Sequence, residues 1–206
     1  MEQAKVCEVR EAIADPSTVG LASFGIALFT LSFLNADLIG PQSMGVIVPT
    51  AIMTGVIHLF ATWYGFRKNE LFTALVFGIY GMFWLTYGLI NLGVAANLFE
   101  LDANALLAFL VAYTIFTAYV LVAALVTNVA VILTLAALLA VFLLLDFGLA
   151  GHPSLFPWAG YVGMVDALLA LYVSAAGLLA TLWGHPVLPV GPIQRAAPRR
   201  FYKAAA

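Results

Sequence analysis

Long apolar runs alternate with short polar breaks along the chain, and each run has the length of a membrane-spanning helix. The stretch 72–93, for example, holds no charged residue and is about as long as a helix must be to cross a bilayer. These runs lack the period-two alternation of a transmembrane β-barrel. The pattern therefore predicts six helical spans: Val19 to Leu38, Gly45 to Tyr64, Leu71 to Leu92, Ala105 to Val126, Val129 to Gly148 and Trp158 to Trp183.

The polar breaks divide the chain into two tails and one membrane domain. Residues 1–18 form a predicted N-terminal tail, residues 19–184 the six-helix transmembrane domain, and residues 185–206 a C-terminal tail. The fourth and fifth spans are separated only by Thr127 and Asn128, so the chain is expected to fold back there as a tight hairpin. The expected fold is all-α.

Composition and charge distribution agree with a polytopic protein of the cell membrane. Of the 206 residues, 64% are hydrophobic and only 9% are charged, whereas a soluble domain has about a quarter charged residues. With six spans, every lysine and arginine falls on one side of the membrane. The positive-inside rule therefore predicts that both termini are cytoplasmic.

The third span carries its polar and aromatic residues on one face. Tyr80, Trp84, Tyr87 and Asn91 recur at helical spacing and form a single stripe. Such a stripe favours a lined passage, and the alternative is an aromatic packing face between helices. Asn35 of the first span and Thr54 of the second extend the set of hydrogen-bond donors along the expected substrate path, which also includes His58.

Two ionisable side chains lie deep in apolar spans. They are His58 in the second span and Asp166 in the sixth. An ionised aspartate is costly at the bilayer centre, so Asp166 is expected to be protonated, or paired with His58, when substrate passes. The alternative role for each is an interhelical hydrogen bond.

Soluble-type enzyme chemistry has no support in the sequence. Clusters with metal-ligand spacing, a glycine-rich phosphate loop and a nucleophile beside a base are all missing from the pattern. We therefore expect neither catalysis nor a metal or cofactor. The basic C-terminal tail is expected to lie against anionic lipid headgroups rather than nucleic acid.

Three segments carry a resemblance to a known family. They are DPSTVGLASFGIALFTLSFLNA from Asp15, FRKNELFTALVFGIYGMFWL from Phe66, and AGYVGMVDALLALYVSAAGL from Ala159 with PVLPVG from Pro186. In order and spacing the chain resembles the acetate uptake transporter family of the succinate–acetate permease type. The signature Asn-Pro of that family is replaced here by Asp15-Pro16.

The resemblance implies six helices around a pore in each protomer, a homohexamer, and transport of acetate, other small monocarboxylates or succinate. It also implies a hydrophobic constriction made by a Phe, a Tyr and a Leu. Phe24 and Tyr80 match the first two positions. At the third position the register gives Ala137, with Leu138 adjacent.

Several functions remain open at this point. The favoured one is a monocarboxylate channel or proton symporter. The alternative is a pore for neutral small solutes such as urea, ammonia or undissociated acid. A non-transporting membrane partner or sensor is a weaker alternative. An intramembrane enzyme is also weaker, because it would need a larger catalytic constellation than His58 and Asp166.

Overall fold

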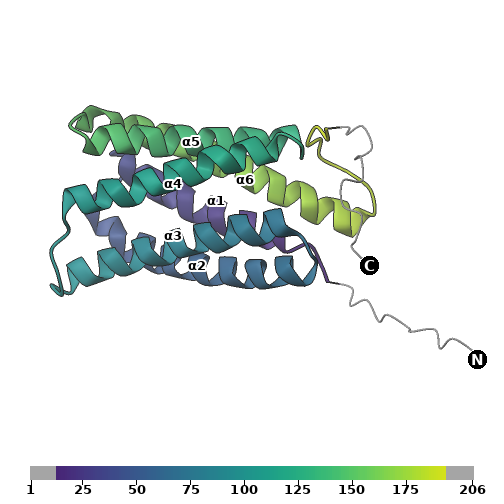
Figure 1. Ribbon diagram of the computed structural model, residues 1–206, viewed down its shortest axis with the longest axis horizontal. Coiled ribbons are helices and arrows are strands. Elements are labelled where there is room, and N and C mark those ends of the chain that lie inside the picture. Colours follow the sequence, from purple (N-terminus) through teal and green to yellow (C-terminus); the bar gives the residue numbers. More distant parts are fainter. Residues whose placement is uncertain (1–12, 194–206) are drawn as a thin grey trace, which may run out of the picture.

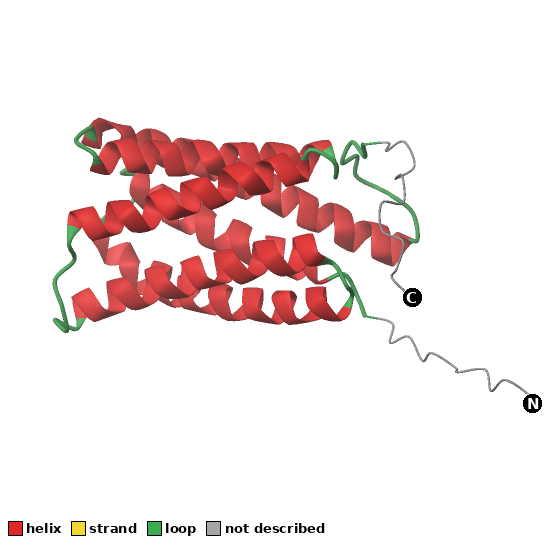
Figure 2. Cartoon of the chain, viewed as in Figure 1, coloured by secondary structure: helices red, strands yellow, loops and turns green. Residues whose placement is uncertain are grey.

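The computed structural model describes residues 13–193, and within them the chain forms six long helices joined by short loops (Figures 1 and 2). No strand occurs in this part of the chain. The long helices are α1 (Pro16–Asn35), α2 (Met44–Arg67), α3 (Leu71–Ala95), α4 (Ala103–Ala124), α5 (Val129–Leu149) and α6 (Phe156–Trp183). Two single-turn helices, η1 (Pro41–Ser43) and η2 (Pro153–Leu155), precede α2 and α6. All six long helices are long and apolar enough to cross a membrane.

The predicted spans match these helices to within a few residues, and capping side chains explain the differences. The first helix begins three residues earlier than predicted, because Asp15 accepts a hydrogen bond from the backbone N–H of Ser17 and Pro16 occupies the first turn. Asn128 caps α5 in the same way, through Val131 N–H at 2.9 Å. The predicted hairpin between α4 and α5 therefore forms at this cap.

The helices pack as neighbouring antiparallel pairs, with α2 against α3, α1 against α6 and α4 against α5 (Figure 1). Glycine permits the closest of these contacts. A Cβ on Gly55 of α2 would lie 2.8 Å from the carbonyl oxygen of Gly81 on α3, and a Cβ on Gly160 of α6 would lie 2.6 Å from that of Ser32 on α1. Gly81 of α3 therefore lies on a helix-packing face.

Both ends of the described chain lie at the same end of the bundle (Figure 1). α6 ends at Trp183, and the next residue, Gly184, adopts the left-handed φ of 75°. Residues 184–193 then turn back across this end. We call this segment the C-terminal strap. Its carbonyls at Val190 and Gly191 accept hydrogen bonds from the first backbone N–H groups of α5, at 3.1 and 2.9 Å.

Candidate functional site

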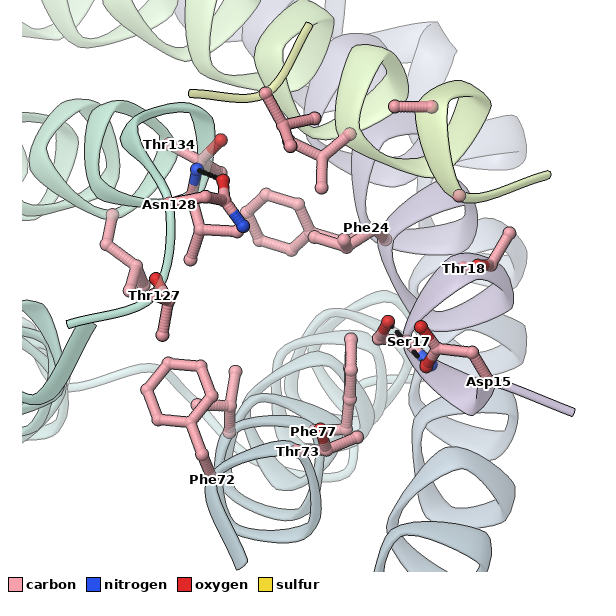
Figure 3. A pocket seen from close by; sticks show the side chains of 18 of the residues that line it. Asp15, Ser17, Thr18, Phe24, Phe72, Thr73, Phe77, Thr127, Asn128 and Thr134 are labelled. Atoms are coloured by element: carbon pink, nitrogen blue, oxygen red, sulfur yellow. Dashed lines mark hydrogen bonds between the residues drawn. The ribbon is translucent and has the colours of Figure 1, made fainter. Parts of the chain in front are cut away.

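A cavity of about 420 Å³ opens at the end of the bundle where the two chain ends lie. Its wall is formed by α1, α3, α5 and α6, with His58 contributed by α2. Pro186, Leu188 and Val190 of the strap also line it. In Figure 3, Asn128 and Thr127 lie on the α5 side of the cavity, and Asp15 and Ser17 lie on the α1 side.

Three apolar or aromatic side chains are the innermost lining residues along α1, α3 and α5. They are Phe24 of α1, Tyr80 of α3 and Leu138 of α5, each of which is buried and lines the cavity. Leu138 lies nine residues into α5, about 14 Å from its first residue. The rings of Phe24 and Tyr80 have centroids 6.3 Å apart. We call these three residues the neck.

Leu138 rather than Ala137 faces the cavity, although the sequence register favoured Ala137. Leu138 is a lining residue and belongs to the buried core with Phe24 and Tyr80, whereas Ala137 is only half-buried and does not line the cavity. A shift of one residue on a helix rotates a side chain by about 100°. Leu138 is therefore the α5 member of the neck.

The side chain of Tyr80 is held in place by α4, a helix that does not line the cavity. Its hydroxyl lies 2.9 Å from the hydroxyl of Thr117, which is fully buried. The ring of Phe116 packs edge-on against that of Tyr80, with centroids 5.1 Å apart. Sequence reasoning missed Thr117, because a lone threonine in an apolar span has no pattern that distinguishes it.

His58 joins α2 to α1 at the side of the cavity. Its Nε2 lies 3.1 Å from the carbonyl oxygen of Gly20, and its ring packs edge-on against Phe77. Thr54, one turn away, donates to the carbonyl of Ser23 at 3.2 Å. Thr54 does not line the large cavity but a small depression between α1 and α2. These two bonds give both side chains a structural role in the α1–α2 contact.

Asp166 is fully buried on α6 and is not among the residues that line the cavity. Within the described chain, neither of its carboxyl oxygens has a hydrogen-bond partner. The pairing with His58 considered from sequence is therefore not present in the structure, where the Nε2 of His58 is bound to the carbonyl of Gly20 and its Nδ1 has no partner among the described residues.

The remaining predicted path residues lie on the far side of the neck. Trp84 packs edge-on against Phe24, with centroids 6.2 Å apart, and its indole nitrogen is buried without a partner among the described residues. Tyr87 contacts Trp84 in turn, and Asn91 donates to the carbonyl of Tyr87 at 2.8 Å. Asn35 is half-buried at the end of α1. The third-span stripe therefore begins at the neck and continues away from the cavity.

Residues 13–193 contain no group of three or more side chains suited to hold a metal ion. Asp15 is the one carboxylate among the lining residues, and neither lysine nor arginine occurs in the described lining. Lys68, near this end, is paired with Glu70 at 2.9 Å. The cavity is thus a largely apolar vestibule with a single acidic residue at its mouth.

Comparisons with known proteins agree with this architecture. The succinate-acetate/proton symporter SatP of Escherichia coli is 28% identical over 182 residues, covering 87% of this chain and 96% of that protein. Acetate permease A of Emericella nidulans is 26% identical over 204 residues, covering 90% of this chain and 68% of that protein. A solved structure of the bacterial acetate channel SatP superposes with a TM-score of 0.83 at 27% identity, covering 87% of this chain and 99% of that one.

A family model extends the agreement to nearly the whole chain. The model described as the GPR1/FUN34/yaaH family matches residues 3–194. This range includes all six helices, the three neck residues and the strap. The chain therefore belongs to the GPR1/FUN34/yaaH family, as its resemblance to acetate uptake transporters indicated.

Proposed function

We propose that this chain is a multi-pass protein of the cell membrane that transports acetate and related small monocarboxylates. Succinate is proposed as a further substrate. The observation that carries the proposal is the vestibule whose lining reaches inward to Phe24, Tyr80 and Leu138 on three different helices. The names of relatives similar over most of this chain support the substrate class.

The neck is proposed to select by size and by dewetting. A hydrophobic constriction excludes hydrated ions, because the water that they carry finds no hydrogen-bond partners there. A small carboxylic acid, by contrast, loses little more than the hydration shell around its carboxyl group. Past the neck, the donors of Trp84, Tyr87, Asn91 and Asn35 are proposed to line the rest of the path, whereas Thr54 is committed to the α1 backbone.

Asp166 is proposed to be protonated when substrate passes. A buried carboxylate with no hydrogen-bond partner and no cation beside it would be costly in its charged form. His58 is proposed to contribute through the position of α1 rather than through a shared proton, because its Nε2 is bound to Gly20. Both residues remain candidates for a proton-sensitive site.

Two further proposals concern topology and assembly. Both termini are proposed to be cytoplasmic, because with six spans every lysine and arginine of the sequence falls on one side of the membrane. A homohexamer surrounded by lipid is proposed on the family resemblance. Large apolar side chains such as Ile26, Phe60 and Ile115 are exposed on the outer surface of the single chain, where lipid or a neighbouring protomer would cover them.

A second candidate function is a pore for neutral small solutes such as urea or ammonia. The observation in its favour is that the described lining offers no cationic side chain for an anion. A relative from Saccharomyces cerevisiae, 26% identical over 173 residues that cover 80% of this chain and 61% of that one, is named ammonia transport outward protein 2.

Uptake into proteoliposomes tests the proposal and separates these functions. Purified protein is reconstituted, and entry of labelled acetate and labelled urea is compared with that into protein-free vesicles, with and without an inward proton gradient. Accumulation of acetate above equilibrium would indicate proton coupling, and simple equilibration would indicate a channel. Urea entry without acetate entry would favour the second function. Entry of neither solute would contradict both.

A further inference from the structure

The hydrogen bond at the neck has a defined direction. Thr117 has one hydroxyl hydrogen, and its Oγ1 lies 2.7 Å from the carbonyl oxygen of Tyr113, which can only accept. The hydrogen between Thr117 and Tyr80 must therefore come from Tyr80, whose hydroxyl lies 2.9 Å away. Tyr80 consequently has no hydrogen left to donate, and it offers only lone pairs to a solute in the neck.

The His58 side chain, which also lines the cavity, has no hydrogen to donate to a solute either. Because the carbonyl of Gly20 accepts, the Nε2 of His58 must carry the hydrogen of their 3.1 Å bond. Its Nδ1 is buried with no partner among the described residues. A doubly protonated ring would leave a charged N–H unsatisfied there, at considerable cost. The neutral ring therefore has an unprotonated Nδ1.

The hydroxyls of the cavity wall are committed in the same way. Thr134 donates to the carbonyl of Ala130 at 3.0 Å, and Thr127 donates to that of Ala124 at 2.7 Å. The remaining hydrogen bonds of lining hydroxyls run from Ser17 to Asp15 at 2.7 Å and from Thr73 to Glu70 at 3.4 Å.

The side chains with hydrogens still available are the amide of Asn128 and the hydroxyl of Thr18, both at helix ends beside the mouth. Donors are therefore confined to the outer part of the described lining, and the inner part offers acceptors. Asp15 adds a carboxylate, which accepts only, at the same mouth.

We propose that small carboxylic acids cross the neck in their undissociated form, with the acid O–H donating to the hydroxyl oxygen of Tyr80. This inference rests on the proposed transport of monocarboxylates and specifies the form that is carried. A carboxylate anion would exchange water donors for acceptors alone among the lining side chains of the neck. An undissociated acid brings the hydrogen that the neck lacks. Its proton crosses with the carboxyl group and is released to water beyond the neck.

Two solutes of the same shape test whether the neck passes the neutral or the anionic form of a solute. Neither solute changes its protonation state during the experiment. Methanesulfonamide is neutral and carries N–H donors, whereas methanesulfonate is a permanent anion with acceptors only. In proteoliposomes we expect protein-dependent entry of the sulfonamide to exceed that of the sulfonate by roughly tenfold or more. Equal entry of the two, or faster entry of the sulfonate, would overturn the proposal.

The electrical response of acetate uptake gives an independent test of the same claim. A tenfold inward potassium gradient with valinomycin makes the vesicle interior positive, and it would drive a monovalent anion inward toward roughly tenfold accumulation. We expect the protein-dependent initial rate of acetate uptake at equal internal and external pH to stay unchanged. A severalfold faster rate would overturn the proposal but leave acetate transport intact. The absence of any acetate uptake would instead overturn the proposed function itself.

The variant Thr117→Val tests the role of the hydrogen bond. It removes the acceptor of Tyr80 while keeping the shape of the side chain, so the Tyr80 hydrogen becomes free to turn toward the neck. We expect methanesulfonate entry to rise severalfold in this variant, to stay low in Thr117→Ser, and to stay low in Thr30→Val. Thr30 makes the same type of bond, to the carbonyl of Ile26 at 2.8 Å, outside the cavity. Unchanged sulfonate entry in folded Thr117→Val protein would contradict the assigned direction.

Discussion

The hydroxyl groups of Tyr80 on α3 and Thr117 on α4 lie 2.9 Å apart in a fully buried contact. This contact links the neck to a helix outside the cavity wall, and it fixes where the Tyr80 ring stands relative to Phe24. The shape of the neck therefore depends on the packing of α4 against α3.

The Tyr80–Thr117 contact should appear as a coupling in stability. Tyr80→Phe and Thr117→Val each remove the bond, so the double variant should lose less than the sum of the single losses. We expect a coupling of about 0.5–1.5 kcal/mol, the usual contribution of one buried hydrogen bond. Unfolding of the four proteins in detergent micelles measures it. Strictly additive losses would show that the two hydroxyls do not stabilise each other.

Close packing of α1 against α6 depends on Gly160. In Gly160→Ala the new Cβ would meet the backbone of Ala36 and lie 2.6 Å from the Ser32 carbonyl oxygen, and neither backbone atom can move freely. We expect a loss of roughly 1–3 kcal/mol from overpacking. Gly45→Ala is the control, because no atom lies within 4 Å of that Cβ. Thermal unfolding that ranks the two variants equally would contradict the observed helix contact.

The strap is anchored by a tyrosine of α6. The Tyr172 hydroxyl donates to the carbonyl of Pro189 at 2.8 Å, so Tyr172→Phe should free this part of the strap and cost about 1 kcal/mol. Tyr161→Phe, on the same helix, has an exposed side chain and no hydrogen bond of this kind, and it should be neutral. Proteolysis within residues 184–193 should speed up only in the first variant. Equal cleavage of the two variants would argue against the anchor.

Asp166→Asn imitates the protonated carboxyl. If Asp166 must be neutral for passage, the wild-type rate of acetate uptake, normalised to the concentration of undissociated acid, should fall at alkaline pH. The normalised rate of Asp166→Asn should not fall. The other titratable groups near the path are unchanged in the variant: Asp15, His58 and Tyr80 in the described cavity lining, and Tyr87 beyond the neck. Asp37→Asn, in the loop after α1, serves as the matched control. If Asp166→Asn showed the same acetate flux and the same pH dependence as the wild-type protein, the proposed role of Asp166 would be contradicted.

Much of this fold follows from local chemistry that a sequence displays. Apolar runs of bilayer length locate the helices, and polar residues such as Asp15 and Asn128 mark where two of them begin. The Phe24 and Tyr80 positions followed from the motifs of the family. The choice between Ala137 and Leu138 did not, because a helix that is apolar on all sides gives no signal for which face meets a cavity.

The features of the site that could not be predicted from the sequence are contacts between distant segments of the chain. Thr117, the strap and the bond between His58 and Gly20 each join positions far apart in the chain, and no local pattern marks them. His58 illustrates the point. Its place in an apolar span was apparent, but only the position of α1 shows that one ring nitrogen is already bound.

Chemical blocking of the neck tests the central claim, that substrate passes between Phe24, Tyr80 and Leu138, most directly. In a Cys7→Ser background, Leu138→Cys and Ala137→Cys are compared in proteoliposomes before and after a small methanethiosulfonate reagent. We expect modification at position 138 to abolish most acetate uptake and to leave uptake through the position 137 variant nearly unchanged. Full uptake after complete labelling of position 138, or block at position 137 alone, would contradict the account.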